Sequence, residues 1–421
     1  MHSYKLLIGG YDGQIHTVQF DPHSRQGPSL EITSTTACGA APTWLTLSED
    51  GKTVYSLDEW GQPGEVTAMS VDEIGQLTKL SSVTTGGLWP CHSSLLSRVS
   101  PQRLVATNYK GASLSSIPLH ASGDIDLTSE AFERIDFLGT RTPGPHRERQ
   151  QQDHPHGAHV DPHHLVVVVP DLGTDDLRVL GIKPDGTLEE FMDPIELAPG
   201  SGPRHVLFST SGERLYVMNE LDNSVTTFAV EYPSTAASLL SKAGLSTSAT
   251  ALSSASAASD RYPSFTLLQS NVSLLPAEPF PHQSSFASWH SAELALSPSG
   301  QTLYASNRAE GHNPLHPPKS DRSDLVAVFP LDADGTLVEA DRTLVEVGGR
   351  CPRHFSLSRR GGPGGETAGG PGADDEGRWM AVVCHDSDEL IVFERVGEDG
   401  RELREVARLE ECGKPAIAVW L

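Results

Sequence analysis

Arginine and histidine recur in one short motif, Pro-Arg-His, at Pro203-Arg204-His205 and again at Pro352-Arg353-His354. Arginine offers a planar, permanently charged fork that binds carboxylate or phosphate and can stabilise an oxyanion. Histidine and glutamate can move a proton near neutral pH when burial tunes them. These residue types therefore indicate an anion-binding site with a base beside it, where water or a substrate carboxylate is activated.

The remaining candidates stand in comparable positions, just before or just after short apolar runs. Before such runs lie Cys91-His92 and His154-Pro155-His156, and after them lie Asn219-Glu220, Asn307-Arg308 and His385-Asp386. Other apolar runs of the chain have uncharged residues without acid–base chemistry at these positions, such as Thr43 and Ala416. The motifs thus mark particular strand ends as functional.

A metal site is the alternative for the histidine-rich segment. Residues i and i+2 of a strand share a face, so His154 and His156 could both be ligands. His163 and His164, however, belong to an Asp161-Pro-His-His turn that lies away from these strand starts. Arginines at the same place also disfavour a cation, and no G-x-S-x-G motif offers a nucleophilic serine. We expect no metal and no cofactor.

The elements that must position these residues repeat along the chain. Each repeat has a proline, an alternating apolar strand, a Ser-Gly or Asp-Gly turn, a second apolar strand and a polar ending. Further strands and Asp-Gly turns lie between the copies, which makes about four strands a repeat. The copies occupy residues 42–59, 90–109, 155–171, 203–220, 291–308, 352–386 and 415–420.

Seven such repeats predict an all-β fold, a seven-bladed β-propeller with four antiparallel strands per blade, formed by residues 1–421 as one domain. The last copy stops after one strand, and segments 5–10 and 14–20 can supply its missing partners. The two termini would then share one blade and leave no open edge. A β-sandwich with a second domain is the alternative.

Blade geometry predicts where the candidates meet. The first strand of a blade runs along the central channel and the second returns, so the start of one and the end of the other share one mouth. We expect His156, Arg204, Glu220 and Arg308 to be catalytic there, unless they only hold neighbouring blades together. Substrate-binding candidates at the same mouth are His92, His154, His205, Arg353, His354 and His385.

Insertions interrupt the repeat at about 141–153, 234–262 and 359–377. The second is Ser/Ala-rich and the third Gly-rich, so both are interpreted as solvated loops, the third at the blade end opposite the Pro-x-His motifs. The first is polar and leads into His154, and it too is interpreted as a solvated loop, with an overhang of the active face as the alternative.

Composition limits the partners. A net charge of −24 disfavours nucleic acid and anionic membranes, and no apolar run approaches the length of a membrane span. Five cysteines without C-x-x-C spacing are typical of reduced thiols, and the residues before Tyr4 lead us to expect no leader. We expect a cytoplasmic protein whose partner is a small anionic lactone or muconate; the oligomeric state stays open.

At these motifs the sequence resembles the seven-bladed propeller lactonase family, which includes 6-phosphogluconolactonases and 3-carboxy-cis,cis-muconate cyclases. The resemblance extends over most of the chain outside the insertions and implies that His156, Arg204, Glu220 and Arg308 are the active residues. The segment 309–324 is longer than the family pattern suggests. The matching phrases are His154-Pro-His156, Gly202-Pro-Arg-His205, Tyr216-Val-Met-Asn-Glu220, Leu303-Tyr-Ala-Ser-Asn-Arg308 and Asp171-Leu-Gly-Thr-Asp175.

The resemblance leaves the reaction open. One branch hydrolyses a phosphorylated sugar lactone in the pentose phosphate pathway, and the other is an isomerase that closes a muconate to its lactone. Both substrates are multiply anionic, so both account for the arginines. We expect lactone hydrolysis, because Glu220 and His156 can position water without further groups. A non-catalytic propeller scaffold is the remaining alternative, although its usual Gly-His and Trp-Asp signatures are missing.

Overall fold

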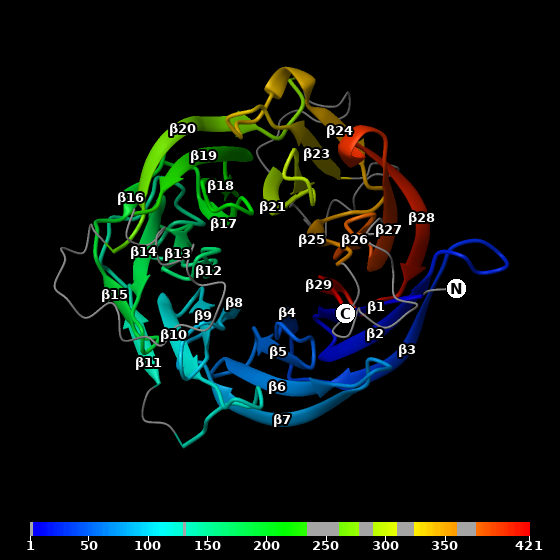
Figure 1. Cartoon of the computed structure of the whole chain (residues 1–421), viewed down its shortest axis with the longest axis horizontal. Helices are drawn as coiled ribbons and strands as arrows, with labels where there is room; N and C mark the ends of the chain where they lie inside the picture. Colours follow the sequence, from blue (N-terminus) through cyan, green and yellow to red (C-terminus); the bar gives the residue numbers. More distant parts are fainter. Residues whose placement is uncertain (1–2, 129–131, 234–260, 278–288, 310–323, 360–375) are drawn as a thin grey trace.

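The computed structural model describes residues 3–421 except 129–131, 234–260, 278–288, 310–323 and 360–375. Seven antiparallel sheets are arranged as a ring around a central axis (Figure 1). Helical structure in these described residues is limited to two 3₁₀ turns, η3 (Glu339–Asp341) and η5 (Glu398–Gly400). The predicted seven-bladed β-propeller is confirmed.

Each blade has its innermost strand first in sequence, apart from the blade that joins the termini. Blade 1 is β4 (Pro42–Leu47), β5 (Thr53–Asp58), β6 (Glu65–Val71) and β7 (Leu77–Thr84). Blade 2 is β8 (Pro90–Leu96), β9 (Arg103–Asn108), β10 (Ser113–Pro118) and β11 (Glu133–Asp136). Blade 3 is β12 (His159–Val160), β13 (Val166–Asp171) and β14 (Asp176–Ile182), with β15 (Leu188–Glu190) and β16 (Ile195–Glu196) both paired to β14.

The other blades follow the same order. Blade 4 is β17 (Pro203–Phe208), β18 (Arg214–Asn219), β19 (Ser224–Glu231) and β20 (Ser264–Ser273). Blade 5 is β21 (Trp289–Leu296), β22 (Thr302–Ala309), β23 (Leu325–Pro330) and β24 (Thr343–Glu346). Blade 6 is β25 (Pro352–Leu357), β26 (Trp379–Cys384), β27 (Glu389–Val396) and β28 (Glu402–Glu410). Blade 7 is β29 (Pro415–Trp420), β1 (Tyr4–Gly10), β2 (Gln14–Asp21) and β3 (Ser29–Ala37).

Blade 7 joins the two ends of the chain, as the repeat predicts. The C-terminal strand β29 pairs with β1, Leu6 opposite Trp420, and so becomes the innermost strand of a sheet otherwise built by the N-terminus (Figure 1). Phe20 and Trp420 of this blade pack with Trp379 of blade 6. Closure therefore leaves no unpaired edge between the first and last repeats, and aromatic rings stabilise the junction.

A β-bulge near the start of the innermost strand is common to all seven blades. In blade 4, Pro203 pairs with Asn219 but His205 already pairs with Met218, so Arg204 is the extra residue. The other blades show the same one-residue register shift. A bulge re-aims a side chain that strand alternation would send elsewhere. It explains how consecutive residues such as Arg204 and His205 both face the ring centre.

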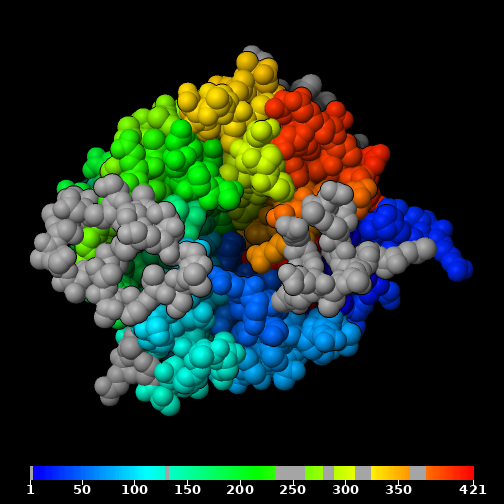
Figure 2. All heavy atoms as spheres, viewed as in Figure 1, coloured from blue at the N-terminus to red at the C-terminus, as the bar shows by residue number. Residues whose placement is uncertain are grey.

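The insertions fall partly outside the described residues. Residues 234–260, 310–323 and 360–375 lie outside the described residues. The expectation that segment 359–377 lies at the blade end opposite the Pro-x-His motifs therefore stays a prediction. Segment 141–153 is described and runs without a strand between blades 2 and 3. The space-filling view shows a depression at the centre of the ring on the face drawn (Figure 2).

Candidate active site

Two positions of every blade build the channel mouth. One is the bulged residue of the innermost strand. The other is the residue of the second strand that directly follows the partner of the proline that starts the innermost strand or, in blade 5, the partner of Ser291. Glu220 holds the second position in blade 4 and Arg308 holds it in blade 5. The bulge positions include Thr43, Cys91, His156, Arg204 and Arg353, and the others include Tyr11, Glu59, Tyr109, Glu220, Arg308 and His385.

The four predicted catalytic residues come together on the Glu220 carboxylate. Arg204 Nε lies 3.0 Å and Arg308 Nη2 3.2 Å from Glu220 Oε2, and His156 Nε2 lies 4.0 Å from the same oxygen. Arg149 Nη2 donates a hydrogen bond to the other oxygen, Oε1. The Glu220 side chain is fully buried, so these cations are what makes a charge tolerable there.

Burial by itself would raise the pKa of Glu220, but the charges of Arg149, Arg308 and Arg204 outweigh it and hold that pKa well below its usual value. Burial, and next the charge of Arg204, lower the pKa of His156 well below its usual value. Burial and the neighbouring Arg308 lower the pKa of Arg204 to about 10. Near neutral pH the site therefore contains an ionised glutamate, a neutral imidazole and charged guanidinium groups.

His205 and His354 lie one level deeper than the arginines that precede them. His205 Nδ1 is 3.2 Å from Glu293 Oε1, and His354 Nε2 is 3.6 Å from Glu293 Oε2. Trp44 of blade 1 packs its ring against His92, His205 and His354, from blades 2, 4 and 6. These predicted binding residues thus meet across the ring centre beneath the mouth, and the His205 ring contacts Arg204 Nη1 at 2.9 Å.

Arg353 and His385 lie on the side of the mouth where Glu59 is the carboxylate. Arg353 Nη2 is 3.9 Å from Glu59 Oε2, and the His385 ring stacks on Tyr11, whose hydroxyl donates to Glu59 over 3.1 Å. His154 is placed at the rim, with Nδ1 3.1 Å from the Tyr109 carbonyl and its ring stacked on Tyr109. Substrate binding by these side chains stays a prediction.

With this geometry in place, comparison with known proteins identifies the family. The family model described as "Lactonase, 7-bladed beta-propeller" matches residues 5–363. The chain belongs to the seven-bladed propeller lactonase family. An Arthroderma benhamiae protein named "Probable 6-phosphogluconolactonase" is 27% identical over 420 residues, which is 98% of this chain and 88% of that one.

Two further relatives agree with this assignment. The Bacillus subtilis 6-phosphogluconolactonase is 33% identical over 230 residues, 54% of this chain and 61% of its own. The structure of the Pseudomonas aeruginosa periplasmic gluconolactonase PpgL matches with a TM-score of 0.72, 24% identity and coverage of 100% of this chain and 99% of that one, which supports the fold. The predicted family, and with it the predicted lactonase type of enzyme, is confirmed.

Arg149 is the one residue of the Glu220 cluster that the sequence motifs of this lactonase-family chain did not indicate. It belongs to segment 141–153, which was interpreted as a solvated loop; the alternative, an overhang of the active face, is what the structure shows at Arg149. The signal available was an arginine in a polar insertion seven residues before His156. Nothing in the repeat pattern gave its position, because the segment is outside the blades.

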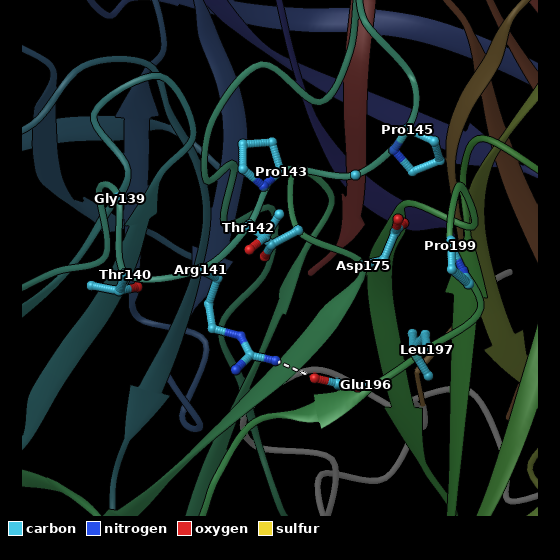
Figure 3. Close-up of a pocket in the computed structure, with 12 residues that line it drawn as sticks. Gly139, Thr140, Arg141, Thr142, Pro143, Pro145, Asp175, Glu196, Leu197 and Pro199 are labelled. Carbon is cyan, nitrogen blue, oxygen red and sulfur yellow. Dashed lines mark hydrogen bonds and ion pairs between the residues drawn. The ribbon is translucent and has the colours of Figure 1, made fainter.

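A surface pocket of about 530 Å³ lies beside the same segment, lined by residues such as Arg141, Pro143, Asp175 and Glu196 (Figure 3). None of the residues that contact Glu220 lines it. Because it contains no member of the Glu220 cluster, we assign the chemistry to the mouth and not to this pocket. Its Arg141–Glu196 pair, 2.7 Å apart, instead anchors the segment.

Two negative findings apply only to the residues that the structure describes. Within them, no three His, Cys, Asp or Glu side chains are arranged to hold a metal ion. In the same part of the chain, no helix is long and apolar enough to span a bilayer. His163 and His164 lie in the turn between β12 and β13, as expected, and His163 Nε2 is 3.1 Å from the Ser211 carbonyl.

Proposed function

We propose that this protein is a lactonase that hydrolyses a small anionic sugar lactone of the 6-phosphogluconolactone kind at the channel mouth. The observation that carries the proposal is the buried Glu220 carboxylate held among Arg149, Arg204, Arg308 and His156. The names of the Arthroderma and Bacillus relatives support the substrate class. Arginines gathered at one mouth of an otherwise strongly acidic protein fit an anionic ligand.

The proposed reaction uses His156 as the base. Its neutral imidazole accepts a proton from water as the water oxygen attacks the lactone carbonyl carbon. Glu220, 4.0 Å away, stabilises the imidazolium that forms, and Arg204 and Arg308 stabilise the oxyanion of the tetrahedral intermediate. The ring C–O bond then breaks, and the leaving oxygen takes the proton back from His156. Lactone and water give one hydroxy acid.

The alternative muconate cyclase activity needs a proton delivered to carbon. The arginines hold the pKa of Glu220 well below its usual value, and burial and Arg204 do the same for the pKa of His156, so neither group is a good proton donor near neutral pH. Hydrolysis needs only that water lose a proton to a neutral base. The protonation states of this pair therefore favour the lactonase over the cyclase.

The test is a side-by-side assay of the purified protein on freshly generated 6-phosphogluconolactone and on 3-carboxy-cis,cis-muconate, with the spontaneous lactone hydrolysis subtracted. We expect accelerated lactone loss and no cyclisation. His156→Gln should lower kcat by about 10²–10⁴-fold, the usual contribution of a positioned base. His163→Gln, in the turn after β12, is the matched control and should retain wild-type turnover. Cyclisation without lactone hydrolysis would overturn the proposal.

A further inference from the structure

The Glu220 carboxylate is fully enclosed, but one of its partners is not. The Arg149 side chain is 26% exposed, whereas those of Arg204 and Arg308 are 4% exposed. Arg204 and Arg308 come from strands β17 and β22, and Arg149 comes from the segment between blades 2 and 3. Of the three arginines that bind Glu220, Arg149 is therefore the one that an anion arriving from solvent meets first.

The segment that carries Arg149 is anchored by other residues. Arg141 pairs with Asp176 at 3.1 Å and with Glu196 at 2.7 Å (Figure 3). Gln150, next to Arg149, is buried and donates from Nε2 to the Leu172 carbonyl at 2.9 Å and to Asp175 at 2.7 Å. The Arg149 side chain can therefore change partner by rotation while the backbone on both sides of it stays in place.

Arg149 also limits what Glu220 can do. Burial favours the neutral acid, and among the charges that oppose burial and lower the pKa of Glu220, that of Arg149 is the largest. A carboxylate that forms ion pairs with Arg149, Arg204 and Arg308 has its negative charge largely offset. It can then give little support to an imidazolium at His156, 4.0 Å away.

We propose that Arg149 is the specificity-determining residue of this site: the anionic group of the substrate, a phosphate or a carboxylate, draws the guanidinium away from Glu220. The charge of Glu220, which Arg149 no longer offsets from Oε1, then stabilises His156 as the imidazole takes the proton from water. This inference rests on the proposed lactonase function and adds to it a requirement for a charged lactone. A lactone without an anionic group leaves Arg149 on Glu220 and reacts slowly.

The test compares two lactones, the phosphorylated 6-phosphogluconolactone and the uncharged glucono-1,5-lactone. The measured quantity is the ratio of their kcat/KM values in the wild type and in Arg149→Ala, with Arg147→Ala as control. Arg147 is an exposed arginine of the same segment. In Arg149→Ala the ratio should fall roughly 10- to 100-fold, the range for one hydrogen bond to a charged group, and Arg149→Lys should restore part of it. Arg147→Ala should keep the wild-type ratio.

A purely structural role for Arg149 predicts a different result. Both lactones would then lose kcat/KM in parallel, and an unchanged ratio overturns the inference. The acid limb of the pH profile gives a second readout. Removing the cation that offsets Glu220, the carboxylate near His156, should move that limb to higher pH in Arg149→Ala and leave it in place in Arg147→Ala. The charged or titratable groups facing His156 and Glu220 include Cys91, His92, Tyr109, Arg149, Arg204, His205, Arg308 and Arg353.

Calorimetry with inorganic phosphate separates this inference from the proposed function. If the wild type accelerates neither lactone, the proposed function fails, and the role of Arg149 as an anion-binding residue is decided by phosphate alone. Weaker phosphate binding by Arg149→Ala than by the wild type and Arg147→Ala supports that role. Equal binding by all three proteins overturns it.

Discussion

Blades 1 and 4 each follow their second strand with a glutamate at the channel mouth, Glu59 in one and Glu220 in the other. The two blades have the same bulge. In each, the residue just before the glutamate pairs with the proline of the innermost strand. Glu59 is bonded by the hydroxyls of Tyr11 and Thr43, with Arg353 at 3.9 Å. Glu220 accepts a hydrogen bond from Arg149 and forms ion pairs with Arg204 and Arg308, with His156 at 4.0 Å.

The difference arises from neighbours and not from the repeat itself. The bulge residue is Thr43 in blade 1 and Arg204 in blade 4, so one glutamate receives a hydroxyl and the other a guanidinium from its own blade. Blade 5 then adds Arg308 and the segment before blade 3 adds Arg149 on one side only. A symmetric scaffold thus becomes an asymmetric site through a few bulge and strand-end residues.

The largest expected effect separates the two glutamates by activity. Glu220→Gln removes the charge that stabilises an imidazolium at His156, and lactone turnover should fall by about 10²–10⁴-fold. Glu59→Gln leaves the Glu220 cluster unchanged and should alter kcat by no more than a few-fold. Initial rates on freshly generated 6-phosphogluconolactone measure both variants. Equal losses would mean that the two sides of the mouth act as one site.

The bulge residues give the second comparison, measured as the free energy of unfolding in denaturant. Arg204→Met leaves Glu220 buried with one cation fewer and should cost roughly 3 kcal/mol, since breaking a buried ion pair is strongly destabilising. The variant should also lose lactonase activity. Thr43→Val removes only a hydroxyl that donates to Glu59 over 2.7 Å and should cost about 1 kcal/mol. A smaller loss for Arg204→Met than for Thr43→Val would contradict the account of the Glu220 cluster.

The repeat made the fold and most of the Glu220 cluster predictable from sequence. Strand alternation and turn residues recur seven times, and the motifs that break the pattern at strand ends include His156, Arg204, Glu220 and Arg308. The periodicity could not show how deep in the channel each side chain lies. Strand alternation cannot place Arg204 and His205 together, and only the bulge sets one at the mouth and the other one level below it. Arg149 lies outside the repeat altogether, so only tertiary structure could pair it with Glu220.

The smallest expected effect is the acid dependence of stability. Despite burial, which opposes ionisation, the arginines lower the pKa of Glu220 in the folded protein below its usual value of 4.5. Such a group adds stability above the unfolded-state pKa, and that stability is lost as pH falls through the folded-state pKa. The free energy of unfolding of the wild type minus that of Glu220→Gln should be constant above about pH 5.5 and should shrink as pH falls below the usual glutamate pKa. Denaturant unfolding between pH 3 and pH 7 measures it, with Glu59→Gln as the reference carboxylate; a difference that grows on acidification would reverse the assigned sign.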